Sequence, residues 1–159
     1  MVAVPQAVRG AQTITQMPTL EDSLITAINE LRQQHGLSAL RRNPELAEAA
    51  RVHSLSMAER GYFEHSSPGG SPFWYRIQSK YSAHHRRYWR VGENLAWASP
   101  SMSAQLAIQL WMNSPPHRSV LLRPGWREIG VGGVHVRPGP GVYRGLPATI
   151  VTADFGVRG

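Results

Sequence analysis

The sequence predicts an α+β domain in which helices flank a small antiparallel sheet. Helix-capping signals at Thr19 and at Asn43-Pro44 precede apolar residues at helical spacing. After Pro124-Gly125 the apolar residues alternate with a period of two, as in strands. A chain of 159 residues fits one domain better than two. Helices first and strands last therefore indicate helices packed on a single sheet.

The N-terminal stretch differs from the rest of the chain. Residues 1–17 show no clear apolar period and are predicted to be a tail or linker, which leaves residues 18–159 as the domain. The stretch is not a signal peptide as it stands, because it lacks a basic start and Pro5 interrupts its short apolar run. No apolar run approaches the ~20 residues that span a bilayer. We therefore expect either a cytoplasmic protein or a mature fragment without its signal peptide.

The elements of the domain follow from local signals. Capping residues begin the helices, and glycine or proline ends them. The expected helices cover residues 19–36, 43–61, 71–76 and 103–113. The expected strands cover residues 129–136, 141–144 and 148–156. Glycines within the first of these strands predict that another element packs closely against it.

The composition limits the partners. The formal net charge is +7, carried by 16 Arg and one Lys, which favours anionic cell-wall polymers, lipid headgroups or nucleic acid. No nucleic-acid-binding motif accompanies the charge, so we expect no such partner. For the basic segment, residues 84–90, we expect weak, salt-sensitive binding to envelope polymers or vesicles. Because the chain has no cysteine, disulfides and thiolate metal sites are excluded. We expect the protein to be a monomer.

Three residues in compact local patterns suggest one site. Glu93 lies between Gly92 and Asn94 in an apolar stretch, and a half-buried carboxylate needs partners. His65 and His117 are the candidate partners. Two imidazoles and a carboxylate suit a divalent metal such as Zn²⁺, with or without hydrolysis by metal-bound water. Alternatively, Glu93 hydrogen-bonds both imidazoles in a purely structural network.

Other polar residues are weaker candidates. Asn94, Ser114 and Arg118 are candidate ligand-binding residues, although Asn94 suits a loop-pinning role and Arg118 suits an anion or a surface acid. A serine near the histidines makes a Ser-His-Glu arrangement conceivable, and only geometry can test it. His53 and His135 are expected to be packed structural residues. No catalytic residue is assigned.

Several motifs in order resemble a known family. They are Phe-Glu-His-Ser at 63–66, Gly-Glu-Asn-Leu-Ala at 92–96, Trp-Met-Asn-Ser-Pro-Pro-His-Arg at 111–118, Ile-Gly-Val-Gly at 129–132 and Asp-Phe-Gly at 154–156. The chain resembles the CAP superfamily of cysteine-rich secretory, antigen-five and pathogenesis-related proteins, and most of all its cysteine-free bacterial branch. The resemblance covers about residues 20–157.

The resemblance implies a three-layer α-β-α sandwich whose cleft is lined by two histidines and two acids. The matching positions are His65, Glu93 and His117, whereas Asn113 and Ser114 occupy the region of the second acid. Family members are mostly extracellular, and several bind sterols or other lipids. The resemblance thus implies a secreted or envelope module that binds a metal, or a small or lipid ligand. The alternative is a metal-dependent hydrolase of wall peptides or proteins, and we favour binding over catalysis.

Overall fold

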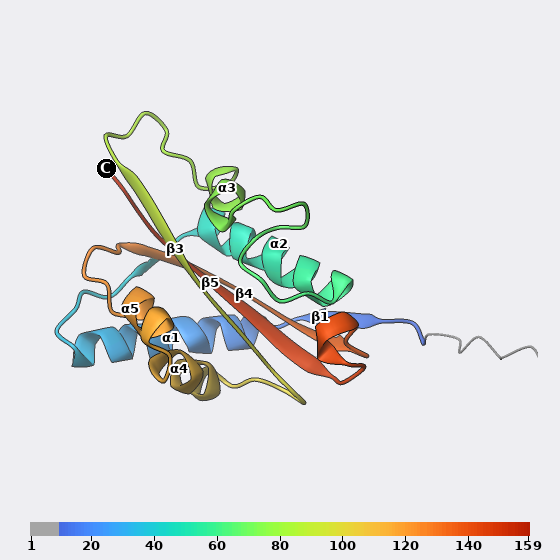
Figure 1. Ribbon diagram of the computed structural model, residues 1–159. Coiled ribbons are helices and arrows are strands. Elements are labelled where there is room, and N and C mark those ends of the chain that lie inside the picture. The colour runs from blue at the N-terminus through green and yellow to red at the C-terminus, as the bar shows by residue number, and fades with distance from the viewer. Residues whose placement is uncertain (1–9) are drawn as a thin grey trace, which may run out of the picture.

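A five-stranded sheet forms the middle layer of the computed structural model, which describes residues 10–159. The strands are β1 (Thr13–Gln16), β2 (Arg41–Arg42), β3 (Trp89–Ala98), β4 (Glu128–Arg137) and β5 (Ala148–Arg158). Their order is β1-β4-β5-β3, with antiparallel neighbours, and the two-residue β2 pairs with β4 in parallel. The sheet lies between two groups of helices, and β3 is one of its edge strands (Figure 1).

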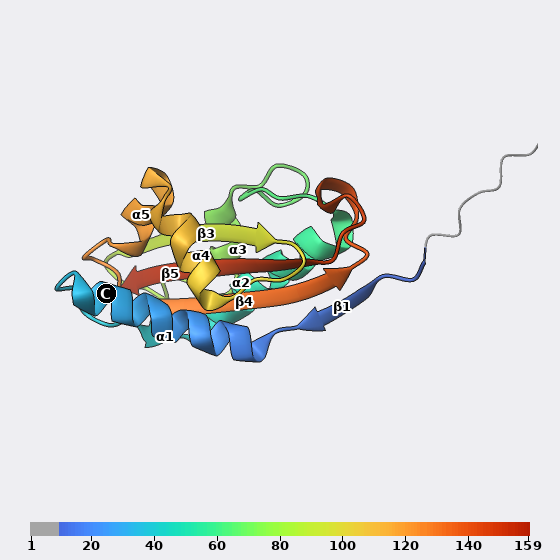
Figure 2. The ribbon, with the colours of Figure 1, turned by 90° about the horizontal axis from the view of Figure 1, so that it is seen from below.

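Helices cover both faces of the sheet (Figures 1 and 2). One face carries α1 (Pro18–Gln34), α4 (Ala104–Met112) and α5 (Pro115–Leu121), and the other carries α2 (Pro44–Arg60) and α3 (Phe73–Gln78). A 3₁₀ turn covers Gly141–Tyr143. This arrangement confirms the predicted three-layer sandwich. Within residues 10–159, every helix is too short or too polar to cross a membrane.

Local signals explain the ends of α2, the helix beneath the candidate site. The Asn43 side chain accepts hydrogen bonds from the backbone N–H groups of Glu45 and Leu46, which a helix start otherwise leaves unpaired. Gly61 ends the helix with φ 71°, a left-handed conformation that glycine adopts without steric cost. A side chain at Gly61 would also collide with the backbone of Pro140.

Glycines of β4 let α2 lie directly on the sheet. A Cβ at Gly130 would stand 2.0 Å from the Ala47 nitrogen, and one at Gly132 would stand 2.3 Å from the Arg51 nitrogen. The predicted close packing is therefore present. In the strand register Gly130 pairs with Asp154, which pairs with Glu93. Paired residues point to one side of a sheet, so both carboxylates face the layer of α2 and α3.

Two segments differ from their predictions. Residues 13–16, placed in a tail or linker, instead form β1 and pair with residues 134–137 of β4. The remaining part of that tail includes residues 1–9, which lie outside the described residues. Residues 141–144 are expected as a strand, but positive φ at Gly141 and Arg144 is incompatible with one, and the segment forms the 3₁₀ turn capped by Arg144.

Candidate functional site

A buried ionic cluster surrounds Glu93. Its side chain is fully buried, and Oε1 lies 2.9 Å from Nδ1 of His65, in the loop after α2. Oε2 lies 2.9 Å from a guanidinium nitrogen of Arg76 on α3. The Arg76 side chain is only 9% exposed, whereas that of His65 is 48% exposed. The cluster therefore has a buried carboxylate–guanidinium pair and one imidazole that reaches solvent.

Asp154 adds a second carboxylate to this cluster. It is fully buried on β5, directly across from Glu93 in the strand register. Its Oδ2 lies 3.7 Å from Arg76, and as an ionised group it would have no hydrogen-bond donor among the described residues. Protonation would give Asp154 a hydroxyl that can donate to Glu93, its neighbour across the strand register.

The pKa values of the two acids move in opposite directions. Burial, followed by the charge of Glu93, raises the pKa of Asp154 well above its usual range, and Arg76 only partly opposes this. Burial would also raise the pKa of Glu93. The hydrogen bonds from His65 and Asp154 and the charge of Arg76 outweigh burial and lower that pKa. The two shifts therefore favour an ionised Glu93 beside the Arg76 guanidinium and the protonated form of Asp154.

His53 on α2 supports the loop that carries His65. It is 1% exposed, and its Nε2 donates to the backbone oxygen of Glu64 at 2.8 Å. Burial lowers the pKa of His53 to about 4, more than the nearby charge of Glu93 raises it. His53 is therefore neutral at pH 7. The prediction that it is a packed structural residue is confirmed.

His117 belongs to the opposite layer. Asn94 follows Glu93 in β3, so its side chain points to the other face, where its amide donates to the backbone oxygen of His117 at 3.0 Å. His117 Nδ1 is hydrogen-bonded to Ser114 Oγ at 2.8 Å. Burial, and then the charge of His65, lower the pKa of His117. Because β3 is the edge strand, the His65 loop and α5 can approach each other around it.

The structure gives the surroundings of the three predicted metal ligands, and metal binding by them stays a prediction. Both oxygens of Glu93 are engaged, one of them by a cation that would repel a metal ion. Within residues 10–159, no group of three or more His, Cys, Asp or Glu could hold a metal. His65 and His117 each have one ring nitrogen bound to a polar partner, and within those residues no partner is found for either Nε2.

The structure adds Arg76 and Asp154 to the predicted site. A signal for Asp154 was present, since it is the only charged residue of β5 before Arg158 and a charge in an apolar strand needs a partner. Arg76 had no such signal, because only the docking of α3 brings it to Glu93. The predicted ligand-binding residue Arg118 lines a separate hollow on α5, described below.

Comparisons with known proteins agree with this fold. Two relatives come from Bacillus subtilis (strain 168). The uncharacterized protein YkwD is 32% identical over 133 residues, covering 80% of this chain and 49% of its own. The uncharacterized membrane protein YlbC is 31% identical over 129 residues, covering 80% and 35%. The chain thus spans half or less of the length of these relatives.

Solved structures include an extracellular protein with an SCP domain from Bacillus anthracis str. Ames. It is 27% identical with a TM-score of 0.67, over 89% of this chain and 41% of that one. An outer surface protein from Borrelia burgdorferi is 23% identical with a TM-score of 0.68, over 92% and 100%, and shows the shared fold. The model of the cysteine-rich secretory protein family, CAP, matches residues 25–155. Although it has no cysteine, the chain therefore belongs to the CAP family.

Proposed function

We propose that this CAP domain is a binding module of the bacterial cell envelope or exterior, and that His65 is its central recognition residue. The observation that carries the proposal is the 2.9 Å contact between His65 Nδ1 and the buried Glu93, on an imidazole that is 48% exposed. By contrast, the structural histidine His53 is only 1% exposed. The exposure of His65 therefore favours binding over a purely structural network.

The chemistry of recognition follows from the tautomer. A lowered pKa keeps Glu93 ionised, so it can only accept, and His65 Nδ1–H must donate to it. The proton on Nδ1 leaves Nε2 with a lone pair, which accepts a hydrogen bond from a ligand or coordinates a cation. Glu93 is then the carboxylate that orients a ligating histidine and raises its basicity, an arrangement common beside bound metals.

A divalent cation such as Zn²⁺ is the ligand we expect for this pair of imidazoles. His65 and His117 would hold it through Nε2, each with its other ring nitrogen fixed, by Glu93 and by Ser114. Two protein ligands give weaker binding than a closed four-ligand site. A bound cation would supply positive charge that attracts an anionic group of a small or lipid ligand.

The envelope or extracellular location rests on family membership and on the solved relative from Bacillus anthracis that is described as extracellular. We propose that the domain acts there as a monomer, with an envelope polymer or lipid as its larger partner. Ser114 Oγ is hydrogen-bonded to His117 Nδ1, but Glu93 bonds His65 instead of His117, so these residues do not complete the conceivable Ser-His-Glu arrangement.

Calorimetric titration with Zn²⁺ alone tests the recognition site. We expect measurable but weak binding at pH 7.5 and weaker binding at pH 5.5, because a cation binds only the neutral imidazole and protons compete for it. His65→Ala and His117→Ala should each abolish most of the binding. Glu93→Gln should weaken it roughly 10- to 100-fold, as expected for a residue that orients a ligand.

His135→Ala is the matched control. This half-buried histidine bonds Thr149 on β5 and lies away from the cluster, so its variant should bind Zn²⁺ like the wild type. Absence of binding at pH 7.5, or binding that survives His65→Ala, would contradict the proposal.

A further inference from the structure

One end of the molecule carries positive charge that no acid of the described chain neutralises. Six exposed arginines form what we call the arginine surface. They are Arg86, Arg87, Arg90, Arg118, Arg123 and Arg127. Ion pairs elsewhere in residues 10–159 involve other arginines, such as Arg41, Arg51 and Arg158. Unpaired positive charge of the described chain is therefore concentrated at this end and extends beyond the basic segment recognised in the sequence, while Arg60 and Arg137 are exposed elsewhere.

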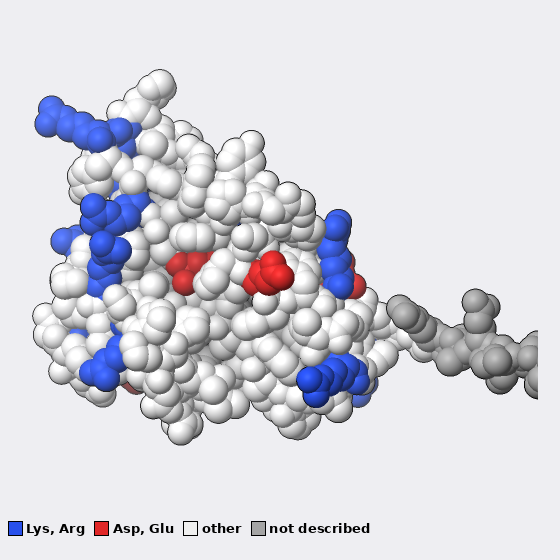
Figure 3. All heavy atoms as spheres, viewed as in Figure 1, with Lys and Arg blue, Asp and Glu red and all other residues white. Residues whose placement is uncertain are grey.

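The strand register places these arginines at a common end of the sheet. Arg90 pairs with Val157 near the end of β5, and the backbone N–H of Arg127 donates to the oxygen of Gly156. Tyr88, which follows Arg87, exchanges backbone hydrogen bonds with Gly159. Figure 3 shows Lys and Arg side chains in a column along this end, where β5 terminates in Figure 1.

A buried guanidinium adds to the charge beneath this surface. Arg32 on α1 is fully buried and donates to the backbone oxygens of Leu121 and Arg123, at 2.8 and 3.0 Å. It caps the C-terminal end of α5, and no carboxylate pairs with it in the described chain. Burial, and then the charge of Arg127, lower its pKa. The positive charge therefore extends into the interior.

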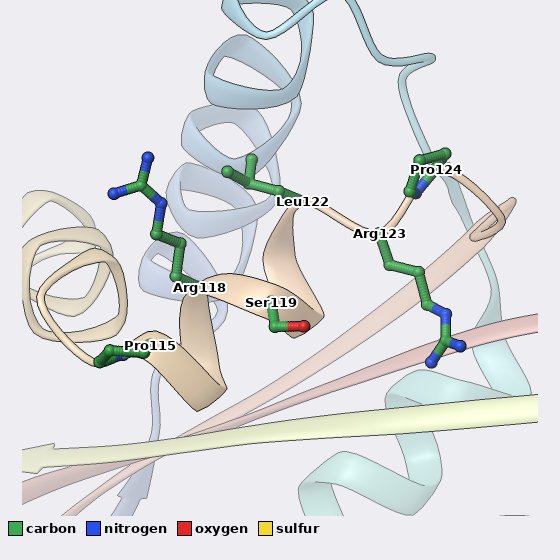
Figure 4. A pocket seen from close by; sticks show the side chains of 6 residues that line it. All are labelled: Pro115, Arg118, Ser119, Leu122, Arg123 and Pro124. Atoms are coloured by element: carbon green, nitrogen blue, oxygen red, sulfur yellow. The ribbon is translucent and has the colours of Figure 1, made fainter.

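The arrangement of the side chains favours an extended partner over a small anion. Arg118 and Arg123 line a hollow of about 540 Å³ with Pro115, Ser119, Leu122 and Pro124. Their guanidinium groups point in different directions from it (Figure 4). Arg123 lies over the ring of Trp126, 5.4 Å from its centroid. Because the two groups diverge, a chain of phosphates laid across α5 suits them better than a single phosphate.

We propose that the arginine surface binds a linear, phosphate-bearing polymer of the cell envelope. Arginine suits phosphate because its guanidinium donates two parallel hydrogen bonds. A membrane surface fits less well, since among the described large exposed apolar residues only Tyr88 lies in the segments that carry these arginines. The envelope origin of the polymer rests on the proposed location, whereas the surface itself is independent of His65.

Binding of fluorescent poly(glycerol phosphate), followed by anisotropy at several salt concentrations, tests the proposal. The double variant Arg118→Gln/Arg123→Gln should weaken binding roughly five- to tenfold at low salt, from two exposed charge contacts. The slope of log Kd against log salt should fall by roughly 0.7 for each lost phosphate contact, as for flexible strands. Inorganic phosphate should compete poorly.

The matched control is Arg60→Gln/Arg137→Gln, which removes the same charge from the ends of α2 and β4. It should keep nearly wild-type affinity, as should His65→Ala, so this test is separate from the Zn²⁺ titration. Equal losses of affinity in both double variants would show that the arginine surface is not the binding site. Tighter binding to duplex DNA or to phosphatidylglycerol vesicles than to the polymer would contradict the proposed phosphate-bearing polymer as the partner.

Discussion

Glu93 and Asn94 are neighbours in β3, both buried, yet their surroundings differ in kind. Glu93 faces α2 and α3, where a guanidinium, an imidazole and a second acid surround it. Asn94 faces α5 and makes one hydrogen bond, to the backbone oxygen of His117. A buried charge requires several partners, whereas a neutral amide is stable with few. The charged face therefore gathers residues from three segments, and only this face presents an imidazole backed by a carboxylate.

Removal of the buried cation should have the largest effect. Arg76→Met leaves Glu93 ionised without its cation, and we expect a loss of about 3–5 kcal/mol in the free energy of unfolding, the usual cost of breaking a buried pair. Urea denaturation at pH 7 measures it. Arg60→Met is the control, because Arg60 is exposed and unpaired in the described chain, and should change stability by less than about 0.5 kcal/mol. Similar losses in both variants would refute the buried cluster.

The charged face should also make the protein acid-sensitive through His53. Its folded-state pKa, about 4, lies below the ordinary value of 6.5, so the unfolded chain takes up a proton first as the pH falls. The stability present above pH 6.5 is therefore lost as the pH falls towards 4, by about 3 kcal/mol in total. Comparison of the wild type with His53→Gln isolates this loss from other groups. Parallel pH profiles of the two proteins would contradict it.

The neutral face should be less sensitive. Asn94→Ala removes one hydrogen bond and leaves the His117 oxygen without this donor, at an expected cost of about 1–2 kcal/mol. The change should not depend on pH between 5 and 8, since neither partner titrates. A loss as large as that of Arg76→Met in urea denaturation would remove the contrast between the two faces.

Asp154→Asn should be the mildest change on the charged face. The raised pKa means that the folded protein keeps a proton that the unfolded chain releases above about 4, so this contribution to stability declines as the pH rises. Asparagine retains a donor for Glu93 without that decline. We expect nearly unchanged stability at pH 5 and a relative gain for the variant at pH 8. A large loss at both pH values would mean that Asp154 is ionised.

Local signals in the sequence predicted much of the fold but missed β1, β2 and β3. The caps of α2 and the glycines of β4 act over a few residues, so they are visible in the sequence. The strand β3 lacks alternation because Glu93 and Asn94 are buried on opposite faces. The four residues of β1 are mostly polar, and only pairing with β4 identifies them as a strand.

The candidate site was predicted only in part, for a similar reason. His65 and Glu93 lie in recognisable motifs, and the structure joins them. Arg76 and Asp154 reach Glu93 through the docking of α3 and the register of β5, which sequence spacing does not encode. His117 lies in an equally clear motif, yet α5 places its backbone on the other face of β3.

The most direct test of the account is the tautomer of His65, read from long-range ¹H–¹⁵N NMR correlations at pH 8. If Glu93 orients His65, the spectrum should show Nδ1 protonated and Nε2 bearing the lone pair, and Glu93→Gln should remove or weaken this preference. A His65 ring with its proton on Nε2 in the wild type would contradict the account, because the exposed nitrogen could then neither accept a hydrogen bond nor bind a metal.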